Sequence, residues 1–144
     1  TTSLNIILLH HETLDGEGFP VHSKQISQEC RIAMVCDTFD EMISGIGCKR
    51  VKLYEVVEYL KNYKNVKFDG KAVDAFLSFV AVYPTGTTVI TNEGERGIVV
   101  RQNKDFQERP VIRITHNNKG EEVTGIVIKD LVKVHNIFIE NVIE

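Results

Sequence analysis

The sequence predicts an α+β fold, with about four helices in residues 1–83 followed by a small antiparallel β-sheet in residues 84–144. In the first part, apolar residues recur at three- and four-residue spacing, which is the period of a helix face. After Pro84, β-branched runs alternate with glycine-containing turns, which is typical of hairpins. Segregated helices and strands favour an α+β fold over a parallel sheet. We therefore expect a helical domain, 1–83, and a small β subdomain, 84–144.

The composition is that of an ordinary globular protein, with 42% hydrophobic and 26% charged residues and a net charge of −3. This charge argues against a broad contact with a nucleic-acid polymer or an anionic membrane, although a local cationic patch would still hold a phosphate. The three cysteines show no paired spacing, which fits a reducing cytoplasm. No apolar run approaches the roughly 18 residues of a membrane-spanning helix, so we expect a cytoplasmic protein without membrane contact.

Four helices are expected. Residues 4–12 favour a helix, with a buried strand as the alternative, and residues 24–44 have the clearest helical pattern, with Ser23 or Ser27 as the cap. The apolar face of this second helix is expected to contain Ile32, Val35, Phe39, Met42 and Ile43. A third helix is expected over residues 51–64. A fourth would begin at the cap Asp69 and end before Tyr83-Pro84.

Five short segments have the composition of strands. Residues 87–91 and 97–101 flank a glycine-rich turn and predict a hairpin. The further candidates are residues 110–115, 122–128 and 136–142. The turn Asn117-Asn118-Lys119-Gly120 separates the first two of these.

Residues 10–20, HHETLDGEGFP, gather the side chains best suited to binding a metal. Imidazole is the commonest transition-metal ligand in proteins. On a helix, His10 and His11 would point about 100° apart, which favours one ion of a closely spaced pair for each histidine. Glu12 would accept a hydrogen bond from a ligand imidazole and fix its tautomer. The ordinary alternative is a pair of solvent-facing histidines near a helix end.

Asp37 adds a carboxylate to this chemistry. It lies within the strongest predicted helix, where Asp40 and Ser44 continue a polar stripe, so a solvated face is the simplest interpretation. Its neighbours Val35-Cys36 and Phe39, however, place it at the border of the apolar face. A half-buried carboxylate there needs a partner, and a metal ion is one option.

In this order, these residues resemble the carboxyl-terminal half of an HD-GYP domain. The motif at residues 10–20 is followed by Ile26, Arg31-Ile32, Val35-Cys36-Asp37, Phe39-Asp40, Met42, Phe68-Asp69, Ala75-Phe76, Tyr83-Pro84, Gly86, Gly94, Gly97 and Arg109-Pro110-Val111. The resemblance covers about residues 4–115. It is specific because many spaced elements agree in order.

Members of this family are helical, metal-dependent phosphodiesterases that typically hydrolyse cyclic di-GMP with two or three iron or manganese ions. The resemblance implies that His10, His11 and Asp37 are metal ligands. It also implies a motif loop containing Glu12, Asp15, Gly16, Gly18, Phe19 and Pro20. The expected ligands are therefore divalent Fe or Mn and a cyclic dinucleotide. A signalling protein is a further expected partner.

The chain departs from the family pattern at three points. Phe19 stands where the family usually has tyrosine. Ile46 occupies the first of two substrate-clamping arginine positions, and Lys49, with Arg50 beside it, takes the second. Lysine is a point charge and not a bidentate fork. The family's His-Asp pair and catalytic lysine precede the HHE motif, so no catalytic residue is expected within this chain.

Two functions remain open. The retained ligands favour a fragment of a cyclic-dinucleotide phosphodiesterase that is inactive on its own. Ile46 favours a degenerate module that binds nucleotide or a protein without turnover. The apolar start of the chain suggests the tail half of a longer protein. Ile6, Ile7, Leu8 and the apolar stripe through Phe39 would then be exposed, with a homodimer or a rearranged packing as the result.

Overall fold

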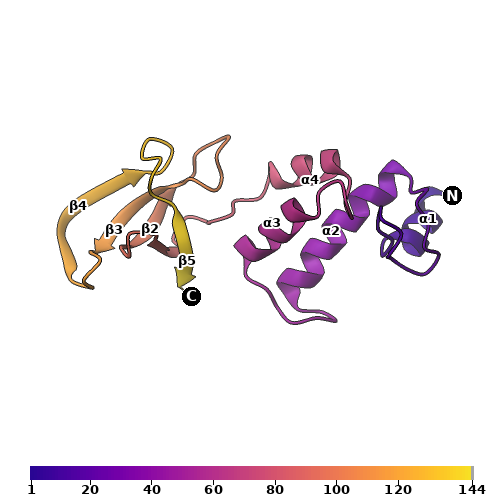
Figure 1. The fold of residues 1–144 in the computed structure, drawn as a ribbon, viewed down its shortest axis with the longest axis horizontal. Helices are drawn as coiled ribbons and strands as arrows, with labels where there is room; N and C mark the ends of the chain where they lie inside the picture. The colour runs from indigo at the N-terminus through magenta and orange to yellow at the C-terminus, as the bar shows by residue number, and fades with distance from the viewer. Residues whose placement is uncertain (144) are drawn as a thin grey trace. The chain divides into compact units, whose positions relative to one another are not determined.

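A computed structural model describes residues 1–143 and contains two compact units, Thr1–Val80 and Ala81–Glu144. The first, here called the helical unit, contains α1 (Thr2–Leu9), α2 (Gln28–Ser44), α3 (Leu53–Asn62) and α4 (Gly70–Leu77) (Figure 1). The second, the β unit, contains β1 (Thr88–Thr91), β2 (Arg96–Arg101), β3 (Val111–His116), β4 (Glu122–Asp130) and β5 (Ile139–Ile143). The predicted α+β fold class is confirmed. Among the described residues, no helix has the length and apolar character needed to cross a bilayer.

Helix α2 is the centre of the helical unit, because it contacts α1, α3 and α4. The Ser27 hydroxyl accepts a hydrogen bond from the Cys30 amide (3.5 Å) and caps its start. Gly45 ends the helix in the left-handed conformation, with φ at 74°. The helix therefore begins four residues later than the sequence predicted, because Ser27, and not Ser23, is the cap.

The core of the helical unit includes part of the apolar face predicted for α2. It consists of Ile26, Cys30, Met34, Val35, Leu60, Phe68 and Val73. Val35 of the predicted face is thus buried, whereas Ile32 of the same face is 48% exposed. Phe39 was expected to be exposed but is half-buried, because its ring packs edge-on against Phe76 with 4.9 Å between centroids.

Helix α4 begins at the predicted cap. The Asp69 carboxylate accepts hydrogen bonds from the amides of Lys71 (3.0 Å) and Ala72 (3.1 Å). The Arg31 guanidinium lies 3.1 Å from the same carboxylate. The bond from the Ala72 amide, followed by the charge and hydrogen bond of Arg31, lowers the pKa of Asp69. This ion pair joins the start of α2 to the start of α4.

Helix α4 is shorter than predicted. It ends at Leu77 and not near Tyr83. The Ser78 hydroxyl donates to the Ala75 carbonyl (2.6 Å), and Phe79 is 88% exposed. None of residues 78–80 is buried, and the buried Val82 and Tyr83 belong to the β unit, so no packing within the helical unit extends the helix past Leu77.

The β unit is an antiparallel sheet in the order β4-β3-β2-β1-β5. The predicted hairpin is present: Val89 of β1 lies opposite Gly97 of β2, and the Thr91 amide donates to the Glu95 carbonyl (2.9 Å) across the turn. Strand β5 returns to pair with β1, so that Val89 also lies opposite Val142. The buried residues of the unit are Val82, Tyr83, Val89, Thr91, Val99, Pro110, Val111, Ile112, Ile114, Leu131 and Ile137, together with Gly97.

Arg109 fixes the segment between β4 and β5. Its Nε donates to the Leu131 carbonyl (2.6 Å), and its Nη2 donates to the carbonyls of Val134 (3.1 Å), His135 (3.1 Å) and Ile137 (2.9 Å). One side chain thus satisfies four backbone acceptors that no strand pairing reaches. The resemblance included Arg109, and the structure shows a stabilising role for it.

Candidate metal centre

His10 follows the end of α1 and has one ring nitrogen engaged. Helix α1 ends at Leu9, where His10 is the C-cap residue. Its Nδ1 lies 2.9 Å from the Ile6 carbonyl. Since a carbonyl can only accept, Nδ1 carries the proton and Nε2 is left with a lone pair. This backbone hydrogen bond is the arrangement that orients ligand histidines in metal sites.

His10, His11 and Asp37 come together in space. One ligand atom from each lies within 4.8 Å of the others, and all three side chains are half-buried. The rings of His10 and His11 are 4.1 Å apart, and Nδ1 of His11 lies 3.6 Å from Oδ2 of Asp37. Two imidazoles and a carboxylate are a donor set that suits a divalent transition metal, so the residues present fit such an ion.

The reasoning that the two histidines would point apart was wrong. It assumed that both are helical, whereas α1 ends at Leu9 and His11 lies in the turn that follows. The turn frees the second ring from helical geometry. Both imidazoles therefore reach the same side of the chain, close to Asp37 of α2.

Phe19 packs against this group. Its ring stacks on that of His11 with 4.7 Å between centroids and 21° between planes. The Phe19 amide also donates to the His11 carbonyl (3.2 Å), which closes the loop onto its own beginning. Phe19 lacks the hydroxyl of the family's tyrosine, but its ring still restricts the orientation of His11, a candidate ligand.

Glu12 has a different role from the one predicted. Its side chain is 1% exposed, and its carboxylate accepts hydrogen bonds from the amides of Val21 (2.6 Å), His22 (3.1 Å) and Ser23 (2.9 Å). It therefore holds the end of the motif loop and does not fix an imidazole. The Ile6 carbonyl fixes the tautomer of His10 instead. A buried carboxylate with three amide donors is strongly stabilised.

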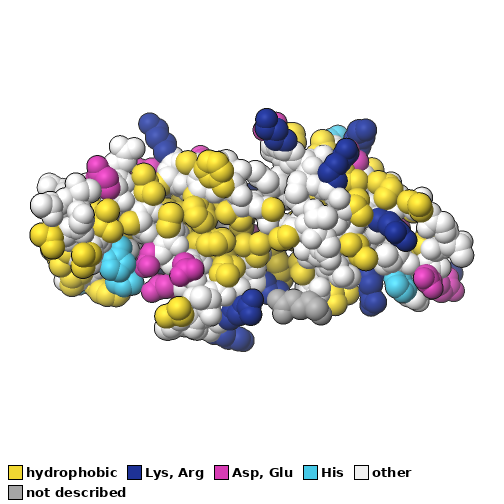
Figure 2. Space-filling model, turned by 180° about the vertical axis from the view of Figure 1, so that it is seen from behind, with side chains coloured by type: hydrophobic (Ala, Val, Ile, Leu, Met, Phe, Trp, Pro, Cys, Tyr) yellow, Lys and Arg dark blue, Asp and Glu magenta, His cyan; other side chains and the backbone are white. Residues whose placement is uncertain are grey.

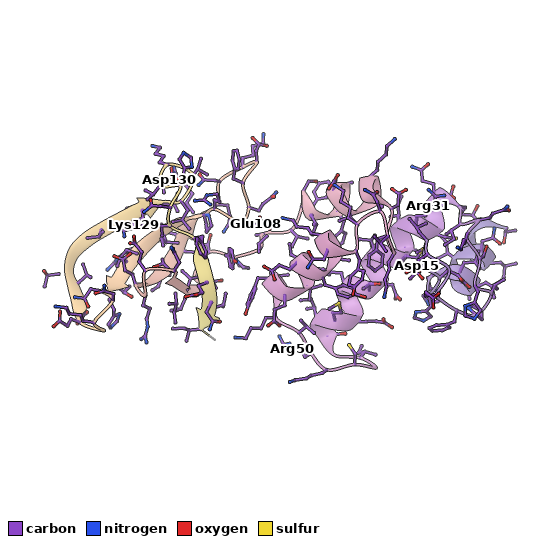
Figure 3. The ribbon with its side chains drawn as sticks, in the orientation of Figure 1. Asp15, Arg31, Arg50, Glu108, Lys129 and Asp130 are labelled. Carbon is purple, nitrogen blue, oxygen red and sulfur yellow. The ribbon has the colours of Figure 1, made fainter. Side chains whose placement is uncertain are left out.

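Close packing explains the glycines of the motif loop. A Cβ atom at Gly18 would lie 2.4 Å from the Glu12 Cα, so only glycine allows the loop to rest on this backbone. Gly16 adopts φ of +83° in the turn. Asp15, labelled in Figure 3, accepts from the Thr13 hydroxyl and the Glu17 amide, and these bonds, the Thr13 bond foremost, lower its pKa.

An open hollow of about 390 Å³ adjoins the histidines. Its lining consists of His10, His11, Glu12, Thr13, Thr38, Glu41, Met42, Cys48, Lys49, Val51, Tyr59, Lys67 and Phe68. Lys49 is thus beside the histidines, as its predicted role requires. Arg50 is exposed on the same loop, outside this lining (Figure 3), and its substrate contact stays a prediction. Ile46 is 69% exposed.

Most residues that line this hollow were not predicted as site residues, and two of them, Lys67 and Tyr59, carry polar groups at the end of a long side chain. Tyr59 lies on α3, and its ring is 4.7 Å from that of Tyr63. Lys67 precedes the cap of α4, and its carbonyl accepts from the Leu14 amide of the motif loop (2.9 Å). The position of Lys67 directly before Phe68-Asp69 could have indicated a site residue, because the family resemblance includes those two residues. Lys67 is far along the chain from residues 10–20, so the sequence alone did not show that it lies beside them.

The comparisons with known proteins agree with this architecture. Residues 3–72 match the family model described as HD domain, and residues 88–144 match the one described as KOW domain associated with HD domain. Residues 3–72 therefore belong to the HD domain family, and residues 88–144, which form most of the β unit, belong to the HD-associated KOW domain family.

A particular relative narrows the relationship. The chain is 33% identical over 115 residues to a cyclic di-GMP phosphodiesterase of Pseudomonas aeruginosa. The match covers 77% of this chain and 27% of the relative, so the chain spans about a quarter of that protein. The resemblance to part of an HD-GYP domain is confirmed. No solved structure gives a significant match.

Proposed function

We propose that the helical unit is part of the site of a metal-dependent phosphodiesterase acting on a cyclic dinucleotide. The gathering of His10, His11 and Asp37 within 4.8 Å carries this proposal. The name of the Pseudomonas relative supports cyclic di-GMP as the substrate. We also propose that the helical part, 1–83, and the β part, 84–144, are separate domains, in line with the two compact units.

The chain's own residues would hold and orient the ion. Nε2 of His10, one ring nitrogen of His11 and a carboxylate oxygen of Asp37 would be its ligands. A divalent ion bound there would polarise a phosphodiester and lower the pKa of water. The Ile6 carbonyl and the Phe19 ring fix the two imidazoles, and Lys49 would attract the substrate phosphate.

Metal binding is the direct test. Calorimetric titration of the 144-residue chain with Mn²⁺ or Fe²⁺ should show one binding site. The His11→Ala substitution should weaken the affinity of this site for the metal ion by about 100-fold, because it removes a ligand. His135→Ala is the matched control, because this histidine is exposed in the β unit. Equal affinity of His11→Ala and the unchanged chain would contradict the assignment of the ligands.

The 144 residues alone should not hydrolyse cyclic di-GMP. Among residues 1–143, the gathered ligand group contains three side chains, whereas a two-ion centre requires more. Rapid metal-dependent conversion of cyclic di-GMP by this chain, measured by chromatography of the products, would contradict this proposal.

A second candidate is a degenerate module that binds a nucleotide or a signalling protein without turnover. The exposed Ile46, where the family has an arginine, favours it. The full-length protein distinguishes the two: binding of cyclic di-GMP in the presence of Mn²⁺ without product formation would indicate the degenerate module.

We also propose that the chain associates with itself through α1. Leu4, Ile7 and Leu8 are 63%, 70% and 52% exposed, while Ile6 packs against the core. Figure 2 shows hydrophobic side chains reaching the surface of the helical unit, on its left. Exposed apolar surface drives association. Light scattering should show a dimer, and Ile7→Glu should shift it to a monomer.

A further inference from the structure

The hollow beside the histidines holds a second cation that the family pattern does not supply. Lys49 enters its lining from the loop between α2 and α3, and Lys67 from the loop between α3 and α4. The two lysines therefore come from separate loops but line one space. Ile46, which stands in the family's first arginine position, is not part of this lining.

The position of Lys67 is well fixed. Its ammonium lies 4.7 Å from the centroid of the Tyr63 ring, a distance at which the ring attracts a cation. Its carbonyl is bonded to the Leu14 amide at 2.9 Å, so its backbone is tied to the loop that follows the histidines. Lys67 is thus held beside the motif loop from two sides.

The lining holds two carboxylates, Glu12 and Glu41, so the charges of the two lysines are formally balanced. The Glu12 carboxylate faces three backbone amides, and the charge of Lys67 also acts on Asp15. A divalent ion held by the candidate ligands would add positive charge beside the two lysines. This is suitable for an anion that also contacts a metal ion.

We propose that Lys67 contacts the substrate phosphate beside Lys49 and so compensates for the arginine that Ile46 replaces. The inference rests on the proposed phosphodiesterase function and adds a residue to it. One guanidinium offers two donors in a fixed fork, whereas two ammonium groups offer two separate point contacts. A phosphodiester has two non-bridging oxygens, so two lysines can contact it together.

Binding of cyclic di-GMP to the 144-residue chain in the presence of Mn²⁺ tests this. Lys67→Met should weaken the affinity for cyclic di-GMP by about tenfold or more, the effect of one lost charge-assisted hydrogen bond. Lys67→Arg should restore most of it, because the positive charge remains. The affinity for Mn²⁺ alone should be the same in all variants. Lys71→Met is the matched control, since Lys71 lines the other hollow, between α2 and α4.

The outcomes separate the inference from the function on which it rests. Absence of Mn²⁺ binding by the unchanged chain would contradict the proposed function itself. Mn²⁺ binding with unchanged cyclic di-GMP affinity in Lys67→Met would contradict only the role of Lys67. Mn²⁺ binding with no cyclic di-GMP binding by the unchanged chain would contradict the cyclic dinucleotide as the ligand of these 144 residues, and the role of Lys67 with it. A matching thermal unfolding curve for Lys67→Met and Lys67→Arg shows that folding is not the cause of any difference.

Discussion

The helical unit and the β unit each hold a segment of irregular chain with a charged side chain, in different surroundings. In the β unit, the half-buried Arg109 donates to four backbone carbonyls. In the helical unit, the buried Glu12 accepts from three amides, and its neighbours His10 and His11 remain half-buried beside an open hollow. Among residues 1–143, only the helical unit gathers candidate metal ligands, and they lie next to its anchor.

Replacing Arg109 should have the largest effect. Arg109→Met removes a donor from four backbone carbonyls, of which that of Val134 keeps its hydrogen bond from the Ile137 amide (3.3 Å), and we expect the β unit to lose about 4 kcal/mol of stability. Hydrogen exchange resolved by segment should show the loss in residues 131–143, with the metal affinity of the helical unit unchanged. Arg113→Met, at an exposed position of β3, is the control. Loss of metal affinity in Arg109→Met would show that the two units are coupled.

Replacing Glu12 should be the counterpart in the helical unit. Glu12→Gln replaces the carboxylate that faces the amides of Val21, His22 and Ser23 with a neutral amide group. We expect this to lower the stability of the helical unit by about 2–3 kcal/mol. Because the loop carries Phe19, metal affinity should fall as well. Glu17→Gln, on the exposed part of the same loop, is the control. If Glu12→Gln destabilises the loop but leaves the Mn²⁺ affinity unaltered, the Glu12 anchor does not support the candidate metal centre.

Acid should weaken both units through their hydrogen-bonded aspartates. The pKa of Asp69 is lowered, chiefly by the Ala72 amide, as is that of Asp15 in the same unit, and that of Asp130 in the β unit is lowered chiefly by the Asn103 amide group. A lowered folded-state pKa means that the stabilisation is present above the ordinary aspartate pKa of 3.8 and is lost as the pH falls through the lowered value. Asp69→Asn should reduce the slope of stability against pH below this value in the helical unit only. An unchanged slope in Asp69→Asn would assign the acid sensitivity to other carboxylates.

The smallest expected effect concerns the ring at position 19. Phe19→Leu retains an apolar side chain but removes the stacking on His11, which is worth about 0.5–1.5 kcal/mol. Mn²⁺ affinity should fall by a few-fold, whereas Phe19→Tyr should retain it. Calorimetry on the two variants measures this difference, and equal affinities would mean that the ring does not orient His11.

The sequence was sufficient for features that depend on neighbouring residues. Asp69 as a cap, the hairpin around Gly94 and the order of helices and strands all follow from local patterns. The clustering of His10, His11 and Asp37 agrees with the resemblance. Local patterns could also mislead, as at Phe79, where apolar spacing continues after α4 has ended.

Features set by distant contacts were beyond the sequence. How much of the apolar face of α2 is buried depends on packing against α4 and α3, so the sequence did not distinguish the buried Val35 from the exposed Ile32. The partner of Glu12 depends on how the loop returns, and the pairing of β5 with β1 depends on the path between β4 and β5. The entry of Lys67 into the hollow has the same origin.

The contact between Gly18 and Glu12 fixes the number of residues in the motif loop. The loop begins at Glu12, lies back against its own first residue and delivers Phe19 onto the ring of His11. An insertion or deletion anywhere in residues 13–18 would displace Phe19 from that ring even if every motif residue were retained. The number of residues between histidine and phenylalanine is therefore as much a part of the site as their identities.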